Sequence, residues 1–595
     1  MASEDLAQLR LSPHPSFTPK PSVLINFPAA NRQQTAQRTG ELLAVNHYPP
    51  HPMINHANHH CFFNEKRFHK CALLTVYHHL PHHLLALYSL GADEKAIQVC
   101  SLSTSYEREA PVQKPIGGVE NVTITTENWT SFLGQAESVK SPFFPICMIQ
   151  CHYVKYRSIN LMVPFLSCSE RYYKNYLQFF LEEVDKKSAV GAIQEYIFSN
   201  PENDMLNRSL SGVLHPLTPF YRECSHPCES RIHIAPDWGY GLEFKIDAIV
   251  AEGNLDSTGL AITAVHEANL SNLKLSDLLR KTINNGAIDG RASDIQQKQM
   301  LSSFDFRCEE KIKVFKPKSG LSAFQIIHKI SQEAGLSDPA LFQSYNTREQ
   351  FSKAAEHPAL IPWLDKWEIE DDSDWKEIIE RTKELLWMVA VIYATSYNGE
   401  QEKFALNFFL DKLSFLQHAW KIYGYELVFY SMHLVTSSLF LPAILPCLDQ
   451  PLRPVLLKAF FRVGISRSPK GEIQATAICI WVGQGRFELR ISECMKEPSF
   501  MQVPASQNPE EKENIWYKVL KSAAKHHDEH TTKLIRALSF NANTYGDSQP
   551  GYYSCDLKGS ELLDSTIFLR VSASIMTLNK LDWEAHGSAM DDRWY

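Results

Sequence analysis

Histidines are the residues of this chain whose type and spacing point most directly to chemistry. The segment HHLPHHLLALYSLGA, from His78 to Ala92, places four imidazoles at the start of an apolar stretch that ends near Gly91. A helix over this stretch would bury a stripe of leucines, and a buried imidazole needs a hydrogen-bond partner or a bound ion. The pattern leaves both interpretations open: histidines satisfied within the core, or metal ligands.

Further histidines stand on stretches with apolar helical periodicity. His79 and His83 are four residues apart, as are His526 and His530, so each pair would share one helix face. Helical proteins build metal sites from ligands on facing helices, but spacing along the chain does not show which helices face each other. The histidines on such stretches are His79, His82, His83, His215, His266, His433 and His530.

Composition and charge limit the class of protein. The 595-residue chain has a net charge of −8, so it lacks the excess of positive charge that is typical of proteins that bind nucleic acid or an anionic membrane. Its longest apolar run is interrupted by Pro442 and Pro446 and is too short to span a bilayer. The first residues show no basic segment followed by an apolar one, so we expect no secretory signal, and the 13 cysteines include no CxxC pair. We therefore expect a cytoplasmic protein with free thiols, and no nucleic-acid or membrane partner.

Helical periods dominate the chain, and strands and helices show no regular alternation. We predict a mostly α fold, with a poorly ordered N-terminal arm over residues 1–45. Residues 46–595 are expected to form one large helical domain with long loops. The chain contains no dinucleotide or P-loop fingerprint, no GxSxG elbow and no HExxH motif.

Local patterns predict individual elements within this domain. Amphipathic helices are expected over residues 322–333, 375–396 and 516–541. Two or three helices are expected within residues 143–200, and a polar loop over residues 276–316.

Several segments, taken in order, resemble the questin oxidase-like proteins of fungal polyketide pathways. The segments are HHCFFNEKRFH, HHLPHHLLALYSLGA, SGVLHPL, WGYGLEF, IVAEG, ERTKELLW, MHLVTSSLFLP, HHDEHTTKLIRAL and STIFLRVSA, which together extend over roughly residues 55–580. This family is similar to oxygenases that open rings of anthraquinones or related aromatic polyketides, formally by Baeyer–Villiger chemistry. The resemblance implies an oxidoreductase of fungal secondary metabolism that uses O₂ on a small aromatic polyketide. It allows NADPH as the reductant.

The resemblance also implies a metal centre, because related ring-cleaving oxygenases look like mononuclear non-haem iron proteins with histidine ligands and a carboxylated lysine. The matching positions are His79, His215, His433 and His530, with Lys533 as the lysine. Imidazole suits iron, and five protein ligands leave one octahedral position for O₂ or a substrate oxygen. A lysine in an apolar site has a lowered pKa, and its free amine can add CO₂ to become an anionic ligand.

Other residues compete for these roles or would support them. Lys383 and Lys458 also stand on apolar helices and are alternative candidates for carboxylation. The histidines expected to orient the metal ligands are His82, His83 and His266.

The chain departs from the family pattern at four places, where extra stretches interrupt segments that should be continuous. They lie near residues 70–77, 218–236, 410–427 and 465–482, and Asp237 replaces a histidine of the pattern. We hypothesise that these stretches are translated intervening sequence. A catalytically inactive family member or scaffold, disrupted by insertions in its site motifs, is therefore the alternative to an active enzyme. A third hypothesis is a metal-dependent hydrolase built on the HHDEH segment, His526–His530.

Overall fold

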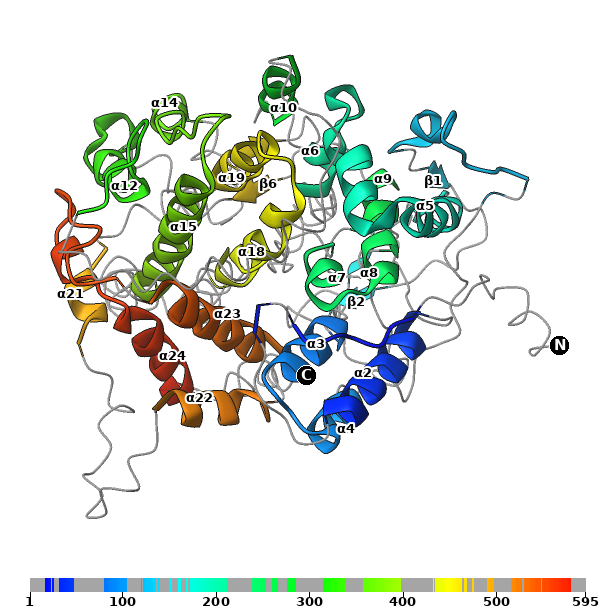
Figure 1. Cartoon of the computed structure of the whole chain (residues 1–595), viewed down its shortest axis with the longest axis horizontal. Coiled ribbons are helices and arrows are strands. Elements are labelled where there is room, and N and C mark those ends of the chain that lie inside the picture. Colours follow the sequence, from blue (N-terminus) through cyan, green and yellow to red (C-terminus); the bar gives the residue numbers. More distant parts are fainter. Residues whose placement is uncertain are drawn as a thin grey trace.

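The structure, a computed structural model of the whole chain, is built mainly from helices (Figure 1). It describes residues 16–22, 24–25, 32–47, 80–103, 119, 121–134, 137–139, 149–151, 159–161, 167–169, 172–210, 238–252, 259–265, 275–284, 314–337, 357–396, 432, 434–462, 465–467, 473–475, 489–496, 515–526, 529–546 and 548–578. The predicted mostly α class is confirmed. Within these ranges no helix has both the length and the apolarity needed to cross a bilayer.

The helices are given in chain order, in three consecutive groups. The first group is α2 (Arg32–His47), α3 (Leu80–Ser89) and α4 (Glu94–Ser103). The second group is α5 (Tyr173–Ile193), α6 (Met205–Leu210), α7 (Trp238–Phe244), α8 (Asp247–Glu252), α9 (Leu260–Val265), α10 (Leu275–Asn284), α12 (Ala323–Gln332) and α14 (Ile361–Leu364). The third group is α15 (Trp375–Ser396), α18 (Leu441–Ile444), α19 (Leu452–Arg462), α21 (Ile491–Cys494), α22 (Ile515–Ala523), α23 (Glu529–Tyr545) and α24 (Thr566–Leu578). The short 3-10 and π segments are η2 (Trp129–Phe132), η3 (Gln194–Phe198), η4 (Pro201–Asn203), η6 (Ala334–Ser337), η8 (Leu445–Cys447) and η11 (Ser560–Leu562).

Short strands pair within the helical framework. All pairings are antiparallel: β1 (Glu137–Val139) with β4 (Ser167–Ser169), β2 (Ile149–Cys151) with β3 (Ile159–Leu161), and β5 (Ile465–Arg467) with β6 (Ile473–Ala475). The helices predicted within residues 143–200 are confirmed in part by α5, but the prediction is wrong at 149–151, 159–161 and 167–169, which form strands, because apolar runs this short have no period that separates strand from helix. Strands β5 and β6 fall in the extra stretch at 465–482, and the other three extra stretches lie outside the described residues.

Helix α23 occupies a central place in the packing. Figure 1 shows α23 between α24 and α3, and α15 and α22 also contact it. One helix was predicted over residues 516–541, but the chain forms α22 and α23 instead. The hydroxyl of Thr532 donates to the carbonyl of Ala523 at 3.1 Å and satisfies an acceptor at the end of α22, which stabilises the break.

The N-terminal region is more ordered than the sequence indicates. Helix α2 forms within the range predicted as a poorly ordered arm, and it buries Thr35, Leu42 and Leu43 while it packs on α3 and α4. Thr35 and Leu42 are seven residues apart and share the buried face of α2. The sequence of α2 has only a weak amphipathic pattern, so we attribute its stability to these tertiary contacts. The division of the chain at residue 45 into an arm and one domain stays a prediction.

The two amphipathic helices predicted at 322–333 and 375–396 are confirmed as α12 and α15. Ser322 begins α12 with a capping box, in which its hydroxyl and the side chain of Gln325 exchange hydrogen bonds with backbone N–H groups. The loop predicted at 276–316 is wrong at its start, since α10 forms there and buries Leu279 and Thr282. The prediction overlooked a clear helical period, because Leu275, Leu279 and Ile283 recur every four residues and Leu278 shares their face.

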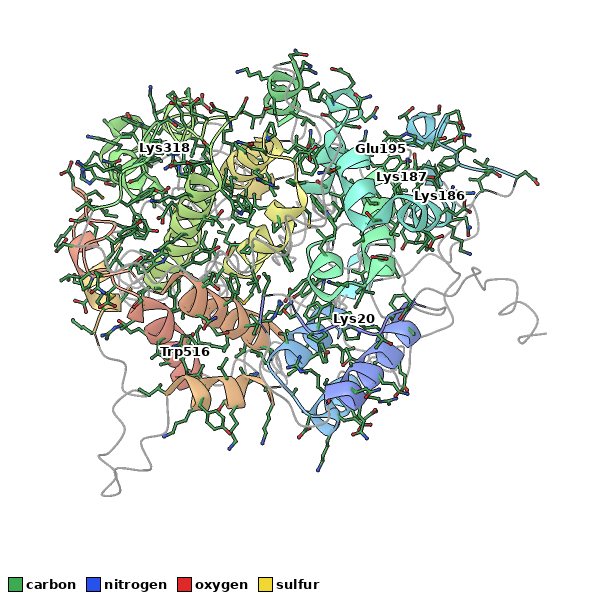
Figure 2. All side chains as sticks on the ribbon, in the orientation of Figure 1. Lys20, Lys186, Lys187, Glu195, Lys318 and Trp516 are labelled. Atoms are coloured by element: carbon green, nitrogen blue, oxygen red, sulfur yellow. The ribbon has the colours of Figure 1, made fainter. Side chains whose placement is uncertain are left out.

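Helix α5 is interrupted at Ser188, where φ is 67° and ψ is 161°. Lys187 bridges the interruption, because its ammonium lies 2.7 Å from both Glu183 on α5 and Glu195 on η3 (Figure 2). Burial raises the pKa of Glu183, but the hydrogen bonds from Lys187, Tyr196 and Lys186 outweigh it, so that the pKa lies below its ordinary value. The carboxylate of Glu183 therefore fastens η3 to α5.

Gly239 allows α7 to approach Phe440 closely, and we expect Gly239→Ala to lower the free energy of unfolding by about 1–3 kcal/mol. A Cβ at this position would lie 2.5 Å from Cδ1 and 2.8 Å from Cβ of Phe440. That ring has little room to move, because it is buried and packs edge-on against Tyr240, with centroids 4.6 Å apart. Urea-induced unfolding followed by circular dichroism measures the change.

Gly191→Ala in α5 is the matched control for this substitution. Its added Cβ would come no closer than 3.4 Å to Lys187, which is ordinary contact. Alanine is also the better helix former by about 0.5–1 kcal/mol, so this variant is expected to unfold at an unchanged or higher urea concentration. Equal losses in the two variants would contradict the close approach at Gly239.

Candidate functional site

The structure describes only part of the metal-ligand set predicted from the sequence. His79, His215 and His433 lie outside the described residues, as do Asp237 and His266. The backbone of His530 lies in the first turn of α23. The side chain of Lys533, one turn further along, is buried with 6% of its surface exposed.

Helices α3 and α23 bring two of the predicted segments together. His83, four residues after His79, places its Nε2 3.2 Å from the backbone oxygen of His526 and 3.3 Å from the hydroxyl of Thr532. A carbonyl oxygen only accepts, so the bond to His526 requires the proton on Nε2. His83 thus ties the segment that follows His79 to the start of the helix that carries His530 and Lys533.

His82 packs against α7 on the neighbouring side of α3. Its imidazole stacks on the ring of Tyr240 with centroids 4.8 Å apart and planes inclined by 20°. Tyr240 also contacts Phe244 and Phe440, so the histidine lies in an aromatic environment. The predicted orienting roles of His82 and His83 remain untested, but both side chains are buried, His82 against α7 and His83 against Thr532 of α23.

A buried ion pair joins the same three helices. Arg536 of α23 donates through Nη2 to Oε1 of Glu243 in α7, and through Nε to the hydroxyl of Ser89 in α3 at 2.7 Å. The side chains of Arg536 and Glu243 are 1% and 0% exposed. The guanidinium also lies 5.5 Å from the ring centroids of both Tyr240 and Phe244, within the range of a cation–π contact.

The residues of this contact form what we call the α3–α7–α23 junction. Its members are His82, His83, Ser89, Tyr240, Glu243, Phe244, Thr532 and Arg536. Sequence reasoning missed Glu243 and Arg536, although one signal was present. Each is a charged residue within a predominantly apolar segment, which indicates that it is buried. A buried charge usually has a partner of opposite charge.

The three candidate lysines differ in their surroundings. Lys458 donates to the carbonyl of Ile369 at 3.1 Å and lies 3.4 Å from a carboxylate oxygen of Asp371. Lys383 places its ammonium 4.8 Å from the ring centroid of Tyr552. Each ammonium group thus has a described partner, an aromatic ring for Lys383 and oxygen atoms for Lys458. Lys383 and Lys458 therefore stay alternative candidates for carboxylation beside Lys533.

Among the described residues, no three or more His, Cys, Asp or Glu side chains come together as a group that could hold a metal ion. Most of the predicted ligands lie outside those residues, and Lys533 is a lysine, which that statement does not cover. The metal-ligand set therefore stays a prediction.

Two curated proteins are similar to part of the chain. The Baeyer-Villiger monooxygenase dmxR6 of Cryptosporiopsis sp. is 25% identical over 202 residues, which cover 34% of this chain and 32% of that protein. The Baeyer-Villiger oxidase ptaJ of Pestalotiopsis fici is 23% identical over 217 residues, which cover 36% of this chain and 34% of that protein. The similarity thus spans about a third of the length of each relative.

A family comparison covers much more of the chain. The model of the questin oxidase-like family matches residues 76–142, 164–424 and 413–538. These ranges include the described parts of α3, α7 and α23 that form the junction, and they contain every predicted metal ligand. The chain therefore belongs to the questin oxidase-like family.

Proposed function

We propose that this protein is an oxygenase that opens a ring of an anthraquinone or a related aromatic polyketide at a non-haem iron centre. Family membership carries the proposal, and the names of the two relatives, both Baeyer-Villiger enzymes, support it. The reaction inserts one atom of O₂ into a carbon–carbon bond beside a carbonyl group and reduces the other atom to water. Two electrons and two protons complete the balance, with NADPH as the proposed electron donor.

The proposed iron ligands are the five residues inferred from the resemblance, namely His79, His215, His433, His530 and Lys533. The donor chemistry fits iron, because imidazole nitrogen and anionic oxygen are ligands that ferrous iron accepts. We propose that Lys533, which is buried, becomes the anionic oxygen ligand: as a neutral amine it would attack CO₂, lose one proton and form a carbamate. The iron would supply the activation of O₂.

The junction supplies the rigid surroundings that such a site needs. His83 holds α3 to the start of α23, and the Glu243–Arg536 pair holds α7 to the same helix. The buried rings of Tyr240, Phe244 and Phe440 surround the ion pair and would help to exclude water from it.

Metal analysis of the purified full chain tests the proposal. After anaerobic incubation with ferrous iron and removal of the excess, we expect about one iron per chain, as for a mononuclear site. His433→Ala and His530→Ala should each lose most of it. His328→Ala, on the partly exposed face of α12, is the control that should keep it.

Two results would contradict the proposed site or favour an alternative. Full iron occupancy in both His433→Ala and His530→Ala would reject the ligand set. A wild-type chain that unfolds at an ordinary temperature and binds no iron would favour the catalytically inactive family member or scaffold. Zinc or manganese bound together with phosphoesterase activity would favour the hydrolase built on His526–His530.

A further inference from the structure

We infer that the buried Glu243–Arg536 pair is a positioning device that sets the placement of α23, and through it the edge of α23 that carries His530 and Lys533. The inference rests on the proposed function, because only that function makes His530 and Lys533 metal ligands. Its structural basis is independent, because it consists of contacts between described side chains.

Arg536 is held from two directions. Its Nη2 donates to Glu243 of α7 and its Nε donates to Ser89 of α3, and the hydroxyl of Ser89 in turn donates to the carbonyl of Ala86 at 2.8 Å. A guanidinium is a rigid planar fork, so two partners on two helices determine the orientation of its plane. Arg536 stands three residues after Lys533 on α23, and a helix rotated or shifted at Arg536 would carry Lys533 with it.

Glu243 is held by a segment that lies far from it in sequence. The hydroxyl of Ser22 donates to the same Oε1 that accepts from Arg536. Residues 16–22 and 24–25, which we call the strap, are bound to α7 through the N–H of Lys20 and the carbonyl of Phe244 at 2.9 Å. Lys20 is labelled in Figure 2. The strap is thus part of the device, although the sequence placed it in a poorly ordered arm.

Tyr88 provides a second attachment for the strap. Its hydroxyl donates to the carbonyl of Pro19 at 3.5 Å, and the ring contacts Phe244. Burial raises the pKa of Tyr88, partly offset by Arg32, so the phenol stays protonated and keeps its role as a donor near neutral pH. The strap therefore contacts both helices that hold Arg536.

The charge of this pair is better explained by orientation than by stability. A buried ion pair is weak evidence for stability, because the desolvation of both charges offsets their attraction. Apolar contacts between α23, α3 and α7 would tolerate small slips of one helix along another, whereas the pair is satisfied in one arrangement. The second oxygen of Glu243, Oε2, is buried and has no hydrogen-bond partner among the described residues, where Oε1 makes the hydrogen bonds of Glu243.

The chain offers a matched control in a different buried ion pair. Arg381 and Glu384 lie one turn apart on α15, with 2.9 Å between Nη1 and Oε2 and both side chains 0% exposed. Glu384 also accepts from the backbone of Ala323 and the indole of Trp367, at 2.5 and 3.0 Å. Its loss should cost stability without moving the Lys533 edge of α23.

The experiment compares Glu243→Gln with Glu384→Gln in the full chain. The first measurement is amide hydrogen exchange of the peptide spanning residues 529–537 in the metal-free proteins. Glu243→Gln should raise its exchange rate by about tenfold through local opening, and Glu384→Gln should leave it unchanged. The second measurement is ferrous-iron affinity, which should fall about tenfold in Glu243→Gln alone.

Each result decides one point. Equal exchange rates for residues 529–537 in the two variants would overturn the positioning role, and so would faster exchange with unchanged iron affinity. If the wild-type chain binds no iron, the proposed function fails, while the exchange measurement still decides whether the pair places α23. Ser22→Ala should produce a smaller change in exchange than Glu243→Gln, because it removes one contact of Glu243 and leaves both charges paired.

Discussion

Arg536→Met is expected to lower the free energy of unfolding by about 3–5 kcal/mol, because it leaves the carboxylate of Glu243 buried without its counter-charge. Both side chains are essentially inaccessible to solvent, so water cannot replace the lost partner without disrupting the packing of α3, α7 and α23. The substitution also leaves the hydroxyl of Ser89 without its donor. Guanidinium-induced unfolding at neutral pH, followed by tryptophan fluorescence and circular dichroism, measures the loss.

Two further variants separate the buried charge from simple loss of a side chain. Combining Arg536→Met with Glu243→Gln removes both charges and should recover a large part of the loss, because no uncompensated charge remains. Arg280→Met on α10 removes an arginine that is 41% exposed and paired with Glu202 and Asp277, and it should cost less than about 1 kcal/mol. If Arg536→Met is no more damaging than Arg280→Met, the junction does not depend on this pair.

Lys533→Ala is expected to abolish iron-dependent ring cleavage and to weaken iron binding by at least about 100-fold. Removal of groups that merely orient metal ligands costs about 10–100-fold in affinity, so the loss of a ligand should cost more. Added acetate or propionate should restore part of the iron binding, because a short carboxylate can occupy the space of the carbamate. Iron titration of the anaerobic protein measures the affinity with and without the added acid.

Lys383→Ala is the control for this prediction, because Lys383 is also buried, with 7% of its surface exposed, and lies on the neighbouring helix α15. It should bind iron as the wild type does. In ¹³C-bicarbonate, the carbamate resonance should be present in the wild type and in Lys383→Ala and absent from Lys533→Ala. Loss of that resonance in Lys383→Ala, with retention in Lys533→Ala, would assign the carboxylated lysine to α15 instead.

Helices that bury a regular apolar stripe were predictable to within a residue or two. The amphipathic patterns at 322–333 and 375–396 predict α12 and α15, and the structure adds the capping box of Ser322 and Gln325 at the start of α12. These elements follow from local chemistry, namely a 3.6-residue period and a capping box that satisfies the first free N–H groups. Elements that depend on distant partners were not predictable, as α2 and the short strands show.

The candidate site was predictable in the same uneven way. The resemblance to the family indicated the segments around His79, His530 and Lys533, and the family match includes all of them. It did not indicate that Glu243 pairs with Arg536, which is 293 residues away. Nor did it indicate that Ser22 donates to the same oxygen of Glu243, Oε1. No local pattern links residues that meet only after the helices have packed.

By itself, the sequence determined the helical class, the family and the apolar faces that drive the helices together, because period and residue type are local properties. Only the tertiary structure decided that α3, α7 and α23 meet around a buried ion pair and that Ser22 of the strap contacts Glu243 of that pair. The physical reason is that a buried charge acquires its partner from the fold. Burial makes such a pair necessary, and the packing of three helices and one extended segment selects which residues form it.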